Sequence, residues 1–449
     1  MTEPRVIPRA QHTLSRRDVD PDALKVLYRL RQAEHLAYLV GGSVRDLLLG
    51  RRPKDFDVGT SAHPYQVKKL FRNCWIIGRR FRLAHVRFGP KIIEVATFRR
   101  QLQPGEEIAQ DGVPAPVLHS EEQLPAGDGL PLIERRHRDE HLIHRDNTFG
   151  TPEEDAFRRD FTINALFYDI ATFSIIDYTG GLEDLRTGVV RCIGDPQVRF
   201  LEDPVRMLRA VALAARLDFA IDAPIMEAIA MLRHEMVRTS PPRLLEEYYK
   251  ILRAGSSERT FRLLASAGLL EPVSAELHAG ASDALWQSLA RVDAYRARFE
   301  ATPDRLTNAI LLGSLLVPLG LAPQLGRPPS PERDQADARR RPVGPRLGDL
   351  PLARRDVEHL RHLLSLQRRL LDVNASPRAQ QALTRRNIFP DALTWLEIHG
   401  GSPELVNHWN ALRTEAANRP AGTAPEDEQA PRRRRRRRRR RRFRPATGQ

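Results

Sequence analysis

The hydrophobic and polar positions divide the chain into a first part with strand-like runs and a second part with helical spacing. Residues 37–40 form a short apolar run typical of a buried strand, and residues 91–98 alternate as a half-buried strand does. Such runs alternate with helical pieces up to about residue 178, and beyond residue 181 the pattern is helical. We therefore predict an α/β head built round a mixed β-sheet, followed by an all-α neck, body and tail.

Local signals mark several helices. Asp20 and Pro21 supply an N-cap and a first-turn proline for one helix. A brief helix over residues 44–49 should follow a glycine turn and end at Gly50. In the C-terminal part, leucines at helical spacing predict an amphipathic helix whose apolar face carries Leu360, Leu363, Leu364 and Leu371.

Changes in composition give the domain boundaries. Residues 101–145 are rich in Pro, Gly, Glu and His, and so long a loop in a compact domain is usually functional or disordered. We interpret it as a mobile insertion, whose clustered histidines are solvated rather than metal-bound. The predicted order is a flexible N-terminus at 1–18, a catalytic head at 19–180, a nucleotide- and RNA-binding neck at 181–255, a body at 256–322, a disordered linker at 323–349, a C-terminal body at 350–415 and a disordered Arg-rich tail at 416–449.

The net charge of +15 is concentrated at the end of the chain. Residues 432–442 and Arg444 supply twelve of those charges, which leaves the rest near +3. A run of like charges cannot pack, and it binds phosphates without regard to sequence, so it either tethers RNA or is simply a solvated tail.

Two cysteines are too few for a disulfide framework or a zinc site, which fits a reducing compartment. No apolar run has membrane-spanning length, and the first residues lack the core of a signal peptide. We expect a cytoplasmic protein.

The candidate chemistry begins with Asp55 and Asp57, which lie two residues apart on a predicted strand and so point the same way. The preceding turn, Gly41 and Gly42, lets a phosphate approach the backbone. Most Asp-x-Asp pairs lie on solvated turns, but this spacing indicates a nucleoside triphosphate site with a divalent metal.

Three stretches resemble, in order, the motifs of the bacterial nucleotidyltransferases that add CCA to tRNA or poly(A) to RNA. They are residues 39–50 (LVGGSVRDLLLG) followed by Asp55 and Asp57, residues 154–166 (EDAFRRDFTINAL) and residues 202–210 (EDPVRMLRA). The resemblance is strong from residue 37 to 255. It implies the class II family of CCA-adding enzymes and poly(A) polymerases.

Further stretches resemble the bacterial poly(A) polymerase branch. These are residues 71–74 (FRNC), 78–86 (GRRFRLAHV), 93–99 (IEVATFR) and 245–250 (LEEYYK), together with the arginine-rich C-terminus. One departure occurs where the family often continues Leu-Arg-Ala-x-Arg-Phe, because this chain has Ala212 and Leu213 in place of the second arginine and the aromatic residue.

The resemblance implies roles for individual residues. Asp55 and Asp57 would hold Mg²⁺ in a two-metal mechanism, with Asp160 as a further catalytic carboxylate. Nucleotide binding would fall to Gly41, Gly42, Arg45, Arg159, Arg206, Arg209, Glu246 and Lys250. Glu94 is a candidate for the third acid, although a salt bridge to a neighbouring arginine explains it equally well. From the residues alone, Arg206, Arg209 and Arg216 form one basic helix face, and Glu246 with Lys250 forms a surface ion pair.

The expected function is template-independent addition of AMP from ATP to RNA 3′ ends, with release of pyrophosphate, to mark RNA for processing or decay. The partners are then RNA 3′ ends and ATP, with no DNA specificity and protein partners that are unknown. CCA addition to tRNA and a non-catalytic RNA-binding role are the alternatives.

Overall fold

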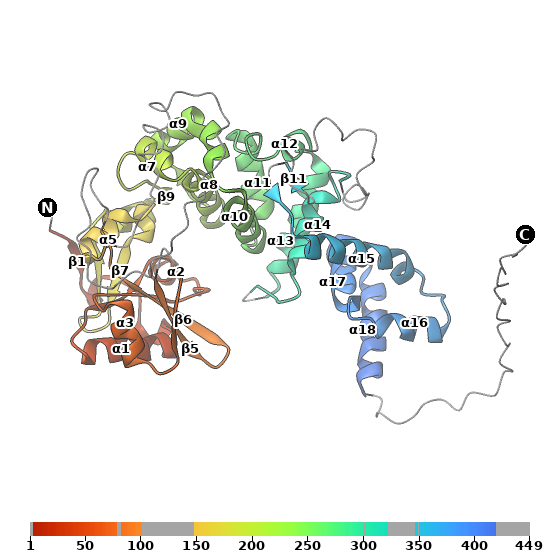
Figure 1. The fold of residues 1–449 in the computed structure, drawn as a ribbon, viewed down its shortest axis with the longest axis horizontal. Coiled ribbons are helices and arrows are strands. Elements are labelled where there is room, and N and C mark those ends of the chain that lie inside the picture. Colours follow the sequence, from red (N-terminus) through yellow and green to blue (C-terminus); the bar gives the residue numbers. More distant parts are fainter. Residues whose placement is uncertain are drawn as a thin grey trace, which may run out of the picture.

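The computed structural model describes residues 3–78, 82–100, 148–299, 302–321, 346–348 and 350–418. The predicted insertion at 101–145, nearly all of the linker at 323–349 and the arginine run lie outside these residues. The predicted α/β head followed by a mainly helical remainder is confirmed (Figure 1). None of the helices in the described ranges is long and apolar enough to cross a membrane.

The head is built on one mixed sheet of eight strands in the order β1-β8-β7-β2-β3-β6-β5-β4, in which only β3 and β6 pair in parallel. The strands are β1 (Arg5–Ile7), β2 (Ala37–Val40), β3 (Asp57–Thr60), β4 (Cys74–Ile77), β5 (Leu83–Phe88), β6 (Lys91–Thr97), β7 (Leu166–Asp169) and β8 (Ser174–Asp177). All four residues of β2 are buried, as its apolar run predicts. In β6 the alternation also holds, since Ile93, Val95 and Thr97 are buried while Glu94 is exposed.

The first residues of the chain correct one expectation. Residues 1–18 are predicted to be flexible, but β1 pairs antiparallel with β8 and buries Ile7. A strand of three residues among polar neighbours is too short for a periodic pattern, and its stability comes from a partner about 170 residues away in the chain.

Five α-helices belong to the head or follow it directly: α1 (Pro21–Gln32), α2 (Gly42–Leu48), α3 (Pro64–Leu70), α5 (Pro152–Arg158) and α6 (Gly181–Thr187). Asp20 caps α1 by accepting hydrogen bonds from the backbone amides of Asp22 and Ala23. Gly50 has a φ of +67°, which lets the chain turn back after α2. These two predicted helix boundaries are confirmed to within about two residues.

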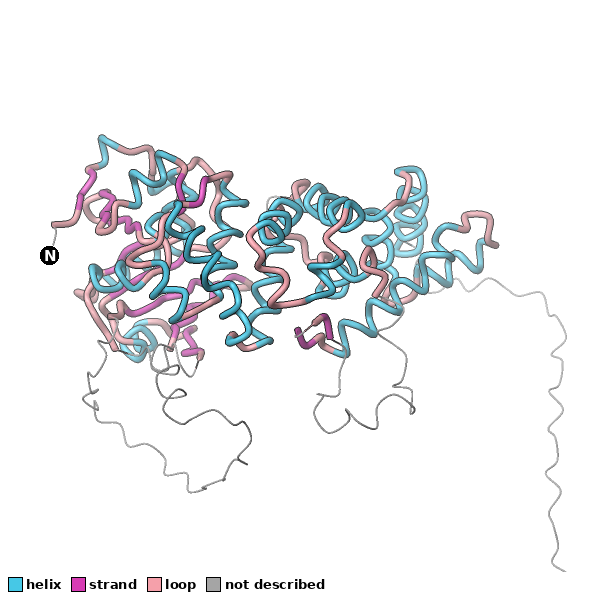
Figure 2. The backbone as a smooth tube through the Cα atoms, turned by 90° about the horizontal axis from the view of Figure 1, so that it is seen from above, coloured by secondary structure: helices cyan, strands magenta, loops and turns pink. Residues whose placement is uncertain are grey.

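The remainder of the described chain is almost entirely helical (Figure 2). Its helices are α7 (Pro196–Glu202), α8 (Val205–Leu217), α9 (Ala223–Leu232), α10 (Pro241–Arg253), α11 (Ser257–Ser266), α12 (Ala275–Ala279), α13 (Asp283–Arg296), α14 (Asn308–Leu316), α15 (Arg354–Leu371), α16 (Pro377–Thr384), α17 (Phe389–His399) and α18 (Pro403–Asn418). Short strand pairs, β9 (Val189–Val190) with β10 (Ala220–Ile221) and β11 (Arg346–Leu347) with β12 (Leu350–Pro351), interrupt them.

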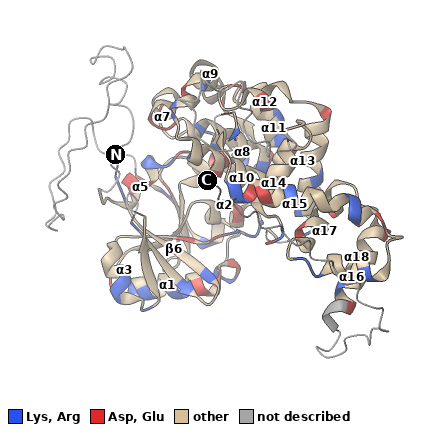
Figure 3. Cartoon of the chain, turned by 45° about the vertical axis from the view of Figure 1, so that its right-hand side comes forward, with Lys and Arg blue, Asp and Glu red and all other residues tan. Residues whose placement is uncertain are grey.

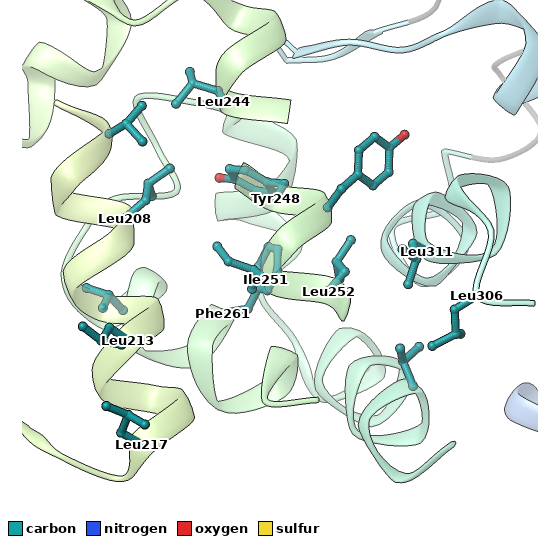
Figure 4. Close-up of a cluster of buried hydrophobic side chains, with 14 of the residues drawn as sticks. Leu208, Leu213, Leu217, Leu244, Tyr248, Ile251, Leu252, Phe261, Leu306 and Leu311 are labelled. Carbon is teal, nitrogen blue, oxygen red and sulfur yellow. The ribbon is translucent and has the colours of Figure 1, made fainter. Parts of the chain in front are cut away.

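The neck helices share one apolar core. Leu208 of α8, Tyr248 of α10 and Phe261 of α11 are fully or almost fully buried and lie within one cluster (Figure 4). Tyr248 meets Phe261 edge to face with ring centroids 5.4 Å apart. This core fixes the rotation of α8 and α10 about their axes, and therefore fixes which of their polar residues face the head.

The apolar face of α15 differs in part from its prediction. Leu360 and Leu363 are buried as expected, but Leu366 and Leu370 complete the face, and Leu371 is 57% exposed. Leu371 is the last residue of the helix, so no following turn covers its side chain.

Candidate active site

The turn between β2 and α2 requires glycine. Gly41 has a φ of +71°, and a Cβ at this position would lie 2.9 Å from Nη1 of Arg159. Directly after it, the buried Arg45 donates from Nη1 to the side-chain oxygen of Asn164 and pairs through Nη2 with Asp46 at 2.7 Å. The sequence places Arg45 in phosphate binding, and the structure fixes its guanidinium at the base of the turn.

The acidic pair is arranged less regularly than predicted. Asp57 is the first residue of β3 and half-buried, whereas Asp55 precedes the strand and its side chain is 72% exposed, with Lys54 at 3.8 Å. The two acids therefore do not lie on one strand. Phe56 between them packs against the core, as expected.

A third carboxylate approaches Asp57 from the next strand. Val58 pairs with Val95 in the parallel ladder of β3 and β6, which puts Glu94 beside Asp57. Burial, the charge of Glu94 and the charge of Asp55 together raise the pKa of Asp57 to about 6. Glu94 is half exposed, and its ionic neighbour in the described chain is His85 at 3.6 Å rather than an arginine.

These carboxylates fit a divalent cation. Among the described residues, no three His, Cys, Asp or Glu side chains converge closely enough to form a complete metal cage. Mg²⁺, however, is usually held by one or two carboxylates together with water and substrate phosphates. A cation at Asp55 and Asp57 would also offset the repulsion that raises the pKa of Asp57.

The second motif forms α5 and the turn that follows it. Arg159 donates two hydrogen bonds to the Asp155 carboxylate, at 3.2 and 2.9 Å, and one to the backbone carbonyl of Asn164. Its guanidinium also lies 5.4 Å from the centre of the Phe167 ring. Asp155 and Asn164 are thus residues that hold the motif together, and both stand in the stretch that the resemblance identifies.

Asp160 links the head to the neck. Its buried carboxylate accepts from the backbone amide of Phe161 and pairs with Nη2 of Arg209 on α8 at 2.7 Å. Burial opposes ionisation, but Arg209 and the amide of Asn164 outweigh it and hold the pKa of Asp160 below its ordinary value. Asp160 therefore has a cationic partner that Asp57 lacks.

The neck arginines do not form a simple exposed face. Arg206 is buried and donates from Nη1 to Glu202 at 2.8 Å and to the backbone carbonyl of Arg199 at 2.9 Å. From α10, Arg243 makes two hydrogen bonds to Asp203. The sequence gave no sign of this second pair, because its members lie forty residues apart.

On α10 the structure selects a different glutamate from the predicted one. Lys250 pairs with Glu247 at 2.9 Å, and both residues line the cleft described below. Glu246 is exposed and lies outside the lining. The predicted ion pair of Glu246 with Lys250 is therefore wrong, because the packing of Tyr248 and Tyr249 turns Glu247 towards the head. Acidic and basic positions alternate along this helix (Figure 3).

Head and neck enclose one cleft of about 1060 Å³. Its lining brings together these predicted residues: Gly41, Gly42, Arg45, Asp57, Arg159, Asp160, Arg206, Arg209 and Lys250. Asp55, Glu94 and Glu246 are not part of the lining. Charged and polar residues that the sequence did not single out for this site also line it: Arg158, Asn164, Glu202, Asp203, Arg216, Arg238, Thr239, Ser240, Arg243 and Glu247.

The described lining contains nine arginines and lysines but five aspartates and glutamates. Positive charge gathered in a cleft with low-dielectric walls attracts polyanions. The arrangement can therefore bind a phosphate-rich substrate beside a carboxylate site for a divalent cation.

Three family models match the chain. Residues 37–191 match the poly A polymerase head domain, and residues 218–280 match the probable RNA and SrmB-binding site of polymerase A. Residues 335–442 match the polymerase A arginine-rich C-terminus.

Curated relatives extend this match. Poly(A) polymerase I of Salmonella typhi is 50% identical over 268 residues, which cover 60% of this chain and 53% of that protein. The enzyme of the same name from Haemophilus influenzae is 42% identical, covering 61% and 56%. The CCA-adding enzyme of Lactobacillus helveticus is 35% identical, covering 57% and 56%. The chain thus spans about half the length of the curated relatives it matches.

A solved structure supports the fold. The Bacillus stearothermophilus CCA-adding enzyme in complex with CTP aligns with a TM-score of 0.56 and 24% identity, covering 89% of this chain and 83% of that one. At this identity the likeness concerns the fold alone. With its three motifs in order and a head model that covers all but the first two strands of the sheet core, the chain belongs to the family of bacterial poly(A) polymerases and CCA-adding enzymes.

Proposed function

We propose that the protein transfers AMP from ATP to the 3′ ends of RNA without a template and releases pyrophosphate. The observation that carries the proposal is the position of Asp57. It stands beside two further carboxylates at the edge of a cleft whose other charged residues are mostly cationic. A metal-binding carboxylate next to a polyphosphate site is the arrangement that nucleotidyl transfer needs.

Asp55 and Asp57 would hold Mg²⁺, with Glu94 as the adjacent third acid. When bound, the cation would lower the pKa of the attacking RNA 3′-hydroxyl and neutralise the triphosphate. The chain's own residues position the reactants. Gly41 leaves room at the β2–α2 turn for a phosphate, and Arg45 stands behind it with its guanidinium held by Asp46.

The neck orients the nucleotide. Arg159, Arg206 and Arg209 are held by carboxylates, so they present fixed donors to phosphate oxygens and to the base. Lys250, paired with Glu247, lies on the facing helix, where it can reach the base. Because the cleft is closed by two bodies, head and neck, their relative placement decides whether a reactive geometry forms.

The domain roles follow from the same reading. The head at 19–180 carries the chemistry, the neck at 181–255 binds nucleotide and RNA, and the helices beyond it hold the RNA. We propose that the arginine run tethers RNA in the cytoplasm. Each phosphate contact would then lower log affinity by about 0.7–0.9 for every tenfold rise in salt.

CCA addition remains the second candidate, favoured by the 35% identity to a CCA-adding enzyme over a similar share of the chain. The 50% identity to poly(A) polymerase I favours poly(A) addition. A non-catalytic role has less support, because a protein without activity gains nothing from the charge repulsion around Asp57.

One experiment separates these functions. The purified chain is incubated with Mg²⁺, a generic RNA and a tRNA lacking its CCA end, and ATP and CTP are offered separately and together. Long ATP-only products on the generic RNA, lost in Asp55→Ala, are the expected result. A three-nucleotide extension confined to the tRNA would replace the proposal with CCA addition, and no incorporation would leave only a binding role.

A further inference from the structure

Arg216, on the last turn of α8, lies in the cleft without an ionic partner. Arg209, Ala212 and Arg216 are spaced by three and four residues, and all three line the cleft. Arg209 pairs with Asp160. Within the described part of the chain, no side-chain or backbone acceptor pairs with the Arg216 guanidinium, although its side chain is open to the cleft.

The surroundings of Arg216 are positively charged. Arg45 and Arg51 lie close enough to act on it electrostatically, and burial together with the charges of Arg45 and Arg51 lowers its pKa. Asp46 is the nearby acid, but its carboxylate is already bound by Arg45 at 2.7 Å. A cation held among like charges and partly removed from water is unfavourable unless an anion joins it.

The end of α8 does not require Arg216 as a cap. A cation in the last turn of a helix can stabilise the exposed carbonyl groups there. Arg51 already performs that task, since its guanidinium donates to the carbonyl oxygens of Arg216 and Leu217 at 3.2 and 3.3 Å. The guanidinium of Arg216 is therefore left free to bind something else.

The sequence departure at position 212 lies on this same face. The motif pattern has an arginine where this chain has Ala212, so the cleft lacks a cation at that point. One helical turn further on, Arg216 faces the same space. The cation is thus displaced along α8 towards Arg45 and the glycine turn.

We propose that Arg216 binds a phosphate group of the incoming nucleoside triphosphate, at the end of the cleft near Arg45, in place of an arginine at position 212. The identity of the nucleotide rests on the proposed function. The chemistry itself is that of a phosphate oxyanion held by two parallel guanidinium hydrogen bonds, which a phosphate of the RNA backbone could also accept.

The test measures phosphate binding and turnover separately in the full chain. Inorganic tripolyphosphate is titrated by calorimetry into wild type, Arg216→Ala and Arg216→Lys, with Arg186→Ala as a control for an exposed arginine outside the cleft. Arg216→Ala should weaken tripolyphosphate binding about tenfold and Arg216→Lys less, because lysine keeps the charge but not the fork. The control should bind as wild type does.

Turnover locates the phosphate. The KM for ATP should rise about tenfold in Arg216→Ala while the KM for RNA stays unchanged, and Ala212→Arg in the Arg216→Ala background should restore much of the loss. A rise confined to the KM for RNA would assign Arg216 to the RNA backbone and overturn the proposal. Unchanged tripolyphosphate binding would make Arg216 a solvated cation and overturn it too.

Two further readings keep the result clear. The melting temperature of Arg216→Ala should equal or exceed that of wild type, since the variant loses only repulsion. A marked fall would show that Arg216 has a partner within the protein, which contradicts the proposal. If the chain fails to polymerise at all, the tripolyphosphate titration still decides the matter, so this inference and the proposed function can fail independently.

Discussion

The head face and the neck face of the cleft treat charge in opposite ways. On the head, Asp55, Asp57 and Glu94 lie near one another, and the cations beside them are Lys54 at 3.8 Å and His85 at 3.6 Å, both distant for an ion pair. On the neck the arginines are matched by acids at hydrogen-bonding distance: Arg206 with Glu202, Arg209 with Asp160 and Arg243 with Asp203.

This difference indicates what each face lacks. The head face carries repulsion that folding alone does not relieve, so it needs a cation from outside to complete it. The neck face is already fixed by its internal pairs, so it can bind a substrate with little further ordering. Removing charge should therefore stabilise the protein on the head face and destabilise it on the neck face.

The largest expected effect is on catalysis at the head. Asp57→Asn keeps the shape of the side chain but removes its charge, and a bound cation contributes several kcal/mol to transfer, so we expect a loss of about 10³-fold in the rate of AMP incorporation. Single-turnover incorporation at saturating Mg²⁺ measures it. Glu227→Gln, an exposed acid on α9, is the matched control. A variant that keeps a tenth of the wild-type rate would remove Asp57 from the reaction.

The same substitution should make the protein without divalent cation more stable. The pKa of Asp57 is about 6 in the folded protein against an ordinary value of 3.8, so the folded state binds more protons between these values and its stability falls as the pH rises through them. Burial comes first among the causes, followed by Glu94 and Asp55. At pH 7 the full cost is present, about 2 kcal/mol after allowance for partial exposure.

Urea unfolding across this pH range tests the sign. Asp57→Asn should exceed wild type by about 2 kcal/mol at pH 7, and the gain should vanish below about pH 4, where the carboxyl is protonated in both states. Mg²⁺ should stabilise wild type more than the variant. A variant that is less stable than wild type at pH 7 would show that the head face is internally compensated, which would end the contrast with the neck.

On the neck, Arg209→Met should act in the opposite direction. It leaves the Asp160 carboxylate buried without its cation, and breaking a buried pair in this way typically costs 3–5 kcal/mol. Because the Arg209 side chain is 44% exposed, water can partly replace it, and we expect about 2 kcal/mol.

Asp160→Asn provides the matching half of the cycle. It leaves the half-exposed Arg209 able to reach solvent, so it should cost less than Arg209→Met, and the double variant should be more stable than the sum of the single changes predicts. Thermal and urea unfolding give the values. Equal costs for the two single variants would mean that the pair is exposed and that it does not fix the neck against the head.

How far the sequence anticipates this site depends on the range of the interactions. Local signals served well, since the glycine turn, the cap of α1 and the alternation of β6 each depend on neighbouring residues. The strand that was assigned to Asp55 begins two residues later, because the Arg51–Lys54 loop is still turning there. Pairs such as Asp160 with Arg209 join segments about fifty residues apart, and no local pattern encodes them.

Helix rotation set a second limit. The resemblance located the element over residues 245–250, but it could not say which glutamate faces the cleft. Adjacent helical residues differ by about 100° in direction, so a small change in the packing of α10 exchanges their roles. The buried Tyr248 and Tyr249 decide the rotation, and they place Glu247 rather than Glu246 beside Lys250.

The smallest expected effect tests that rotation. Glu247→Gln frees Lys250 and changes the charge inside the cleft, so we expect the KM for ATP to change about threefold, while Glu246→Gln should change it less than twofold. Neither should alter the free energy of unfolding by more than about 0.5 kcal/mol, because Lys250 is largely exposed and such pairs contribute little. The two variants carry the same chemical change one residue apart, so each is the control for the other. A larger effect from Glu246 would mean that α10 turns when the nucleotide binds, and the neck face would then be less fixed than its ion pairs indicate.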